Sequence, residues 1–205
     1  MKNNKKLNAA TITELGMLMA ITIVMGTTTL GTIPTPVLDI SLVTIPVAIA
    51  AINVGLLGGA VCGATFGMTS FIRAATATTS SMTSIMFQIS PVKMFITAVC
   101  ARILMGIITA GVFKALDKAK ALDKPKYFIA ALCAPVCNTL LFMSCLMIFF
   151  YHSDFIQQKA VTFGTKNPVG IAVAMVGIQG VVEAIVGMIV GGAVAFAVAK
   201  ALRRS

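Results

Sequence analysis

The sequence predicts an all-α membrane protein, a bundle of six transmembrane helices that forms a single integral membrane domain over residues 1–205. Of these residues, 58% are hydrophobic and 11% are charged, whereas soluble domains are about 45–50% apolar and about 25% charged. The mean hydropathy is +0.98. A bilayer core of about 30 Å needs about 20 apolar residues per helix, so six crossings use roughly 120 to 140 residues. Only short loops remain, too short for a folded aqueous domain.

Glycine, proline and polar breaks divide the apolar sequence into six segments. The expected spans are residues 7–30, 40–57, 58–71, 91–113, 127–150 and 168–199. The second span is short and contains Pro46, while the fourth begins at Pro91, a residue type favoured in the first turn of a helix. Polar residues, mostly Ser and Thr, fill 73–84, and we expect one or two helical turns through 85–89.

Basic residues give the expected orientation in the membrane. Sixteen Lys and Arg against six Asp and Glu give a net charge of +10, but they lie between apolar runs rather than on one basic face, so no nucleic-acid partner is expected. With six spans the two termini share a side, and that side collects eleven of the sixteen Lys and Arg. Because cytoplasmic loops carry the excess of Lys and Arg, both termini are predicted to be cytoplasmic.

Two ionisable residues fall near the middle of predicted spans, Arg102 in the fourth and Glu183 in the sixth. A charge at a helix centre in lipid costs about 2.5–3.5 kcal/mol on insertion scales, so such residues face the bundle interior and have a partner or a function. They either pair as a structural salt bridge or contact a ligand. Gln179 lies one turn before Glu183, and Asn138 lies near the middle of span five. Both are candidates for a polar interior, or for hydrogen bonds between helices.

The segment between spans three and four is a candidate site for an anion. It is dense in hydroxyl groups and has a cation near each end, on the side from which positive charge is otherwise depleted. The candidate binding residues are Thr69, Arg73, Gln88 and Lys93. The alternative is a solvated loop.

Small residues recur at helical spacing on two spans. Gly59, Gly63 and Gly67 do so on span three, and Gly16 and Ala20 on span one. Such stripes let helices approach closely. They indicate either packing within the bundle or docking of a second membrane subunit.

Several absent motifs exclude classes of enzyme. The chain has no His-Glu-x-x-His, no Gly-x-Ser-x-Gly and no phosphate-binding Gly-x-x-x-x-Gly-Lys-Ser/Thr, and His152 is its single histidine, so we expect neither enzymatic activity nor ATP hydrolysis. The five cysteines lie in apolar stretches, where free Cys packs as a small hydrophobe. No metal site and no cofactor are expected, and the energy for any transport must come from another subunit.

Several further features together carry a family resemblance. They are the total size, the six spans, the Lys-rich start, Ile45-Pro46-Val47, Gly55, Gly58-Gly59, Gly63, Phe66-Gly67, Ser70-Phe71, and the spacing from Pro91 through Arg102 to Gly106. With these the chain resembles the substrate-binding S components of energy-coupling factor (ECF) transporters, which import vitamins and other micronutrients in bacteria.

The resemblance implies a fold and a set of partners. It implies a six-helix bundle in the bacterial plasma membrane, with a vitamin pocket near the external face. It also implies docking onto a membrane scaffold, the T component, which carries two cytoplasmic ATPases. In that family the scaffold contact is typically Ala-x-x-x-Ala on span one, and here the corresponding residues are Gly16 and Ala20.

The aromatic composition guides the choice of substrate. The chain has no Trp and two Tyr, so it offers little for stacking on flat rings, and pantothenate is the first choice. Its carboxylate would meet Arg73 or Lys93, and its hydroxyls and amide would meet Thr69, Asn138 or Gln179.

Three alternatives stay open. One is riboflavin, stacked on Phe66, Phe71 or Phe87. Another is a homodimeric, proton-coupled secondary carrier in which Glu183 carries the proton. The third is a structural subunit of a larger membrane complex.

Overall fold

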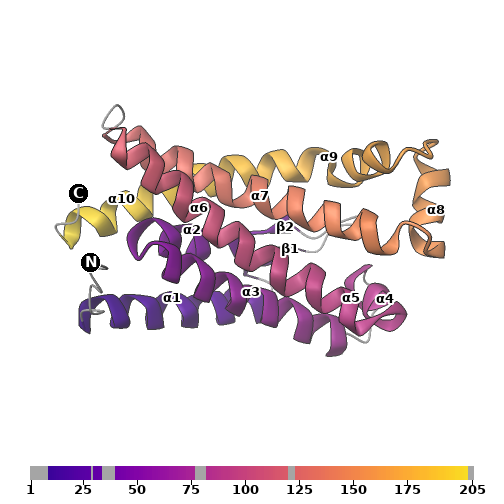
Figure 1. Cartoon of the computed structure of the whole chain (residues 1–205), viewed down its shortest axis with the longest axis horizontal. Helices are drawn as coiled ribbons and strands as arrows, with labels where there is room; N and C mark the ends of the chain where they lie inside the picture. The colour runs from indigo at the N-terminus through magenta and orange to yellow at the C-terminus, as the bar shows by residue number, and fades with distance from the viewer. Residues whose placement is uncertain (1–8, 29, 34–39, 77–81, 120–122, 203–205) are drawn as a thin grey trace, which may run out of the picture.

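The computed structural model describes residues 9–28, 30–33, 40–76, 82–119 and 123–202, which are almost entirely helical (Figure 1). Six of the Lys and Arg residues that are predicted to be cytoplasmic, at positions 2, 5, 6, 120, 203 and 204, lie outside these ranges. The long elements are α1 (Ala9–Thr27), α3 (Leu56–Thr76), α6 (Ala101–Lys118), α7 (Pro125–Phe150) and α9 (Pro168–Val186). The short ones are α2 (Thr44–Asn53), α4 (Met82–Ile89), α5 (Pro91–Phe95), α8 (Asp154–Thr162), α10 (Gly192–Ala201), the π-helical turns η1 (Ile96–Cys100) and η2 (Gly187–Gly191), and the strands β1 (Thr32–Ile33) and β2 (Ile40–Ser41).

Five helical stretches of the described chain are long and apolar enough to cross a membrane. They are Ala9–Thr27, Leu56–Thr76, Pro91–Lys118, Pro125–Phe150 and Pro168–Ala201. The chain is therefore a multi-pass helical membrane protein. The segment expected as the second span is shorter than predicted, because α2 has ten residues and an α-helix of that length reaches about 15 Å, half of the bilayer core.

Local chemistry explains why α2 is short. Pro46 lies in its first turn, where the missing N–H costs nothing. Gly55 follows the helix with a φ of +87°, a conformation that side-chain-bearing residues rarely adopt, so the helix stops there. Eight of the ten residues of α2 are buried, which is how a half-length helix is accommodated inside a membrane protein.

The bundle has two distinguishable ends. The start of α1, the end of α10, the end of α6 and the start of α7 lie at one end, which we call the terminal end (Figure 1). The short helices α4, α5 and α8 lie at the other, the α8 end. Strands β1 and β2 pair antiparallel, with Thr32 opposite Ser41, and this small hairpin lies part-way along the bundle rather than at either end.

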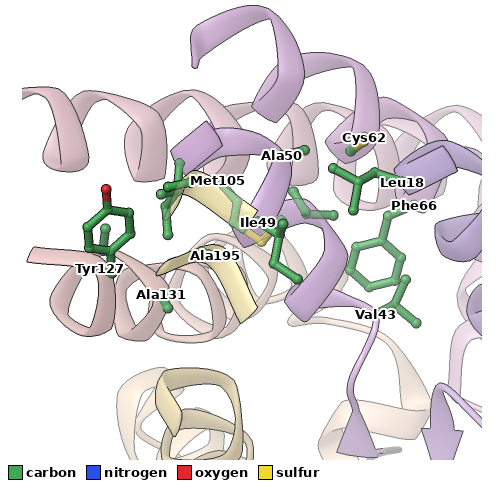
Figure 2. Packing of buried hydrophobic residues seen from close by; sticks show 14 residues of the cluster. Leu18, Val43, Ile49, Ala50, Cys62, Phe66, Met105, Tyr127, Ala131 and Ala195 are labelled. Carbon is green, nitrogen blue, oxygen red and sulfur yellow. The ribbon is translucent and has the colours of Figure 1, made fainter. Parts of the chain in front are cut away.

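The core consists of two clusters. Figure 2 shows the first, in which Ile49 and Ala50 of α2 lie among Leu18, Phe66 and Met105 of the surrounding long helices. The second occupies the half of the bundle toward the α8 end and is rich in Met and Phe, including Met86, Met94, Phe142, Phe150 and Met175.

The glycine stripe on α3 is an internal packing surface. A Cβ at Gly59 would collide with the backbone of Gly106, and one at Gly63 with the carbonyl oxygen of Arg102. At Gly67 it would meet the backbone of Val99. The backbones of α3 and α6 therefore touch, as stripes of small residues allow in membrane bundles, and this contact fixes the position of the Arg102 backbone.

Candidate binding site

Arg102 and Glu183 are both buried inside the bundle, with 8% and 6% of their surfaces exposed. They come from different long helices, α6 and α9, and their opposite charges attract. Their side chains do not form a salt bridge, however. Among the described residues, the ion pair within 4.0 Å is the one between Lys126 and Asp117. Each of the two charges is held by other groups.

Arg102 is fixed by one hydrogen bond and two aromatic rings. Its Nη1 donates to the carbonyl oxygen of Ala98 at 2.9 Å. Its guanidinium carbon lies 4.3 Å from the ring centroid of Phe66 on α3 and 5.3 Å from that of Phe142 on α7. Cation–π attraction of this kind is strengthened when the pair is shielded from water. The Nε of Arg102 is buried and has no hydrogen-bond partner, so a preorganised donor remains available.

Glu183 ties the hairpin to the last long helix. Its Oε1 accepts a hydrogen bond from the backbone N–H of Ser41 at 2.5 Å. Non-helical backbone at membrane depth must find such a partner, because lipid offers none. The hydroxyl oxygen of Ser41 is buried beside this contact and has no hydrogen-bond partner.

Asn138 adds a third available polar atom. It is 9% exposed on α7, and its Oδ1 has no hydrogen-bond partner. Phe142 follows it by one turn, so both lie on the face of α7 that packs toward Arg102. We call Ser41, Arg102, Asn138 and Glu183 the central polar cluster. Leaving a buried polar group unsatisfied costs about 1–3 kcal/mol, so spare atoms of this kind mark positions where a ligand or an ordered water bonds.

Both charged members of the cluster lie beside π-helical turns. The turn η1 contains Ala98 and ends two residues before Arg102, while η2 begins four residues after Glu183. Single π-helical turns inside α-helices are rare and are frequent at functional sites. Their coincidence with the two buried charges favours a functional interpretation of the cluster.

The other predicted site residues lie in three places. Gln179 lies half-buried one turn before Glu183, on α9. Thr69 is buried, donates to the carbonyl oxygen of Phe66 at 2.8 Å and packs against Gly26. Arg73 is half-buried, and its Nη1 donates to the carbonyl oxygen of Gly26 at 3.5 Å. Thr69 and Arg73 thus hold the end of α3 against the end of α1.

Gln88 and Lys93 are exposed at the α8 end, on α4 and α5. The backbone N–H of Lys93 donates to the Ser90 hydroxyl that caps α5. Residues 77–81 of the predicted anion segment lie outside the described residues.

The roles of three residues that contact the charged members of the cluster were not predicted from the sequence. Ser41 takes part through its backbone N–H, which gives no signal in the sequence, since every residue other than proline has one. Phe66 and Phe142 are apolar residues in apolar helices, and only their positions against Arg102 distinguish them from ordinary core. Phe66 was singled out for stacking on a flavin, but in the structure it covers a guanidinium group.

The small residues on α1 face outward, unlike those on α3. Gly16 and Ala20 are exposed, and a Cβ at Gly16 would meet nothing within 4 Å. Large apolar side chains next to them, such as Met17 and Val24, are also exposed. Packing within the chain therefore does not account for the pair.

No group of three or more His, Cys, Asp or Glu in the described part of the chain is arranged to hold a metal ion. Cys133 and Cys137 approach each other with their sulfurs 3.5 Å apart, one turn apart on α7. Two half-buried thiols of this kind are short of the four ligands of a structural zinc site.

The comparisons with known proteins bear on the same part of the chain. A family model described as the substrate-specific component of ECF transporters matches residues 10–196. This range covers nearly all of the five membrane-spanning stretches, apart from residue 9 and residues 197–201, and the whole central polar cluster. A comparison with curated proteins finds no match.

Proposed function

Because the chain belongs to the family of ECF transporter substrate-specific components, we propose that it captures a small anionic nutrient in the central polar cluster. Members of this family are transport proteins rather than enzymes. They bind small-molecule substrates in the membrane and work with a T component and ATPases. The observation that carries the proposal is Arg102, held between Phe66 and Phe142 with a spare Nε donor.

The proposed topology has six crossings, with both termini in the cytoplasm of a bacterial cell. In its support, α1 begins and α10 ends at the terminal end of the bundle (Figure 1). The short helix α2, with the hairpin before it, serves as the second crossing. Basic residues follow the same arrangement, since the described lysines of the terminal end include Lys114, Lys118, Lys124, Lys126 and Lys200, as the cytoplasmic side requires.

For the substrate we propose pantothenate, a carboxylate that also carries an amide and hydroxyl groups. The spare Nε–H of Arg102 is suited to the carboxylate, since a charge-assisted hydrogen bond is about twice as strong as a neutral one. Asn138 Oδ1 and Ser41 Oγ are suited to the amide N–H and the hydroxyls. Gln179 and Glu183 extend the polar lining along α9. Arg73 and Lys93, with Thr69 and Gln88, lie nearer the α8 end and draw the anion in before it reaches Arg102.

The positions of the aromatic rings favour this choice over riboflavin. One face of Phe66 is covered by the Arg102 guanidinium. Phe71 is engaged edge-to-face with both Phe87 and Phe95, at centroid distances of 5.5 and 5.3 Å. A flavin ring would have to displace these contacts before it could stack. A proton-coupled carrier would need Glu183 to exchange protons, and that carboxyl is engaged by the Ser41 N–H.

The exposed pair Gly16 and Ala20 is proposed as part of the surface that meets the T component. Close approach of two helices in lipid requires small residues at the contact. On α1 these two residues lie on the outer face, with space over Gly16.

Binding calorimetry on the purified protein in mild detergent tests the substrate proposal. We expect saturable binding of pantothenate, about tenfold or more weaker in Arg102→Met, because a hydrogen bond to a charged group contributes about 1.5–3 kcal/mol. The matched control is Lys126→Met, a cation-to-Met change at the cytoplasmic end. Unchanged affinity in Arg102→Met, or tighter binding of riboflavin than of pantothenate, would contradict the proposal.

A further inference from the structure

An apolar groove of about 530 Å³ runs between α7 and α9, separate from the central polar cluster. Its α7 wall comes from residues 139–148 and its α9 wall from residues 168–177. The rim consists of Leu140 and Ile148 on one side and Val169 and Val173 on the other, which are 62% to 74% exposed. Ala172 lies between the rims. The groove therefore opens laterally, on the outer surface of the bundle.

The surroundings of the groove are lipid. Both walls belong to helices that are long and apolar enough to span a membrane. Ten residues of helix extend about 15 Å at 1.5 Å per residue, half of the bilayer core of about 30 Å. The groove thus has the length of one leaflet's hydrocarbon, and it starts near the α8 end, where α7 finishes and α9 begins.

The groove ends at a polar contact at the α8 end. The Tyr151 hydroxyl, three residues beyond Ile148, donates to the carbonyl oxygen of Lys166 at 2.7 Å. Lys166 precedes Pro168 by two residues, and its side chain is exposed. Tyrosine is enriched at this depth, where hydrocarbon gives way to headgroups. Residues 151–167 contain two lysines, Lys159 and Lys166, and one carboxylate, Asp154.

We propose that this groove binds one phospholipid, with an acyl chain between α7 and α9 and its phosphate paired with Lys166. The apolar walls, the one-leaflet length and the lysine at the polar end all match that single molecule. A partner helix fits less well, because helix contacts in lipid use small residues and this rim presents branched side chains. The proposal is independent of the substrate that the central polar cluster binds.

Native mass spectrometry of the protein, released from detergent containing dioleoyl phosphatidylglycerol or dioleoyl phosphatidylcholine, tests the lipid site. The wild type is expected to retain one phosphatidylglycerol in preference to phosphatidylcholine. Ala172→Phe fills the groove and should lower retention about tenfold, as expected when about two methylene groups of the acyl chain lose their burial at about 0.8 kcal/mol each. The matched control is Ala174→Phe, a change at an exposed position on α9 that does not line the groove.

Lys166→Ala tests the headgroup contact without altering the packing, since that side chain is exposed. We expect about fivefold lower retention of phosphatidylglycerol, because a lysine near a lipid surface contributes about 1 kcal/mol. The proposal is overturned if Ala172→Phe and Ala174→Phe retain equal lipid, or if the preference for phosphatidylglycerol survives Lys166→Ala. It is also overturned if the groove mediates a dimer that Ala172→Phe abolishes.

Discussion

Glu183 accepts a hydrogen bond from the backbone N–H of Ser41, a residue 142 positions earlier in the chain. This contact anchors the hairpin of β1 and β2 to α9 inside the bundle. It also places the carboxylate within the electrostatic reach of Arg102. One side chain thus satisfies a backbone donor that lipid cannot satisfy and offsets part of a buried positive charge.

Glu183→Ala is expected to destabilise the protein. The change leaves the Ser41 N–H unsatisfied, which costs about 1–3 kcal/mol, and it removes the negative charge near Arg102. Thermal unfolding in detergent should show a clear drop in Tm, while Asp154→Asn, which alters an exposed carboxylate on α8, should leave Tm nearly unchanged. Equal Tm values for Glu183→Ala and the wild type would mean that the contact does not hold the hairpin.

The glycines between α3 and α6 are expected to tolerate no side chain. Gly63→Ala places a Cβ against the carbonyl of Arg102, and overpacking of this kind costs about 1–3 kcal/mol. Gly111→Ala is the control on the same helix pair, because a Cβ there meets nothing within 4 Å. Chemical or thermal unfolding should separate the two variants, and a Gly63→Ala protein as stable as Gly111→Ala would contradict the close contact.

Arg73→Ala and Lys93→Ala are each expected to weaken binding of an anionic vitamin by up to about 1 kcal/mol, because each change removes a positive charge that attracts the anion toward Arg102. The effect of Lys93 should fade at high salt, because its side chain is exposed and exposed charges are screened. Calorimetry at low and high ionic strength measures both. If affinity is unchanged in both variants, these cations do not contribute to the site.

Ala20→Leu is expected to spare ligand binding while reducing co-purification with the T component. The larger side chain projects from the outer face of α1, where Gly16 and Ala20 are exposed, and prevents a close helix contact. Ala174→Leu introduces the same change on an exposed position of α9 and serves as the control. An intact complex with Ala20→Leu would place the T-component contact elsewhere.

Much of the fold follows from hydropathy, and its departures have local causes. The long spans can be recognised in the sequence because a run of about 20 apolar residues between breaks has the length of a membrane-spanning helix. The second span is short because Ile40–Ser41 form a strand and Gly55 adopts a positive φ, neither of which is evident from the sequence. Likewise, α9 departs from helical geometry at Gly177, and nothing in the sequence distinguishes that residue from Gly170 or Gly180.

The candidate site, like the fold, could be predicted only in part from the sequence. Arg102 and Glu183 could be singled out because a charge inside a span is costly and so needs a reason. Their partners could not, since Ser41 acts through its backbone and Phe142 looks like any core residue. Of the two alternatives for Arg102 and Glu183, a salt bridge between them or contact with a ligand, the salt bridge does not form: Arg102 bonds to Ala98 and Glu183 to Ser41, which depends on three-dimensional placement.

Reconstitution of this chain alone in liposomes tests the central claim, that it is a passive receptor whose import depends on associated ATPases. The account predicts saturable binding of labelled pantothenate at the outer surface and no accumulation above the outside concentration, with or without a proton gradient. Concentrative uptake by the chain alone would contradict it.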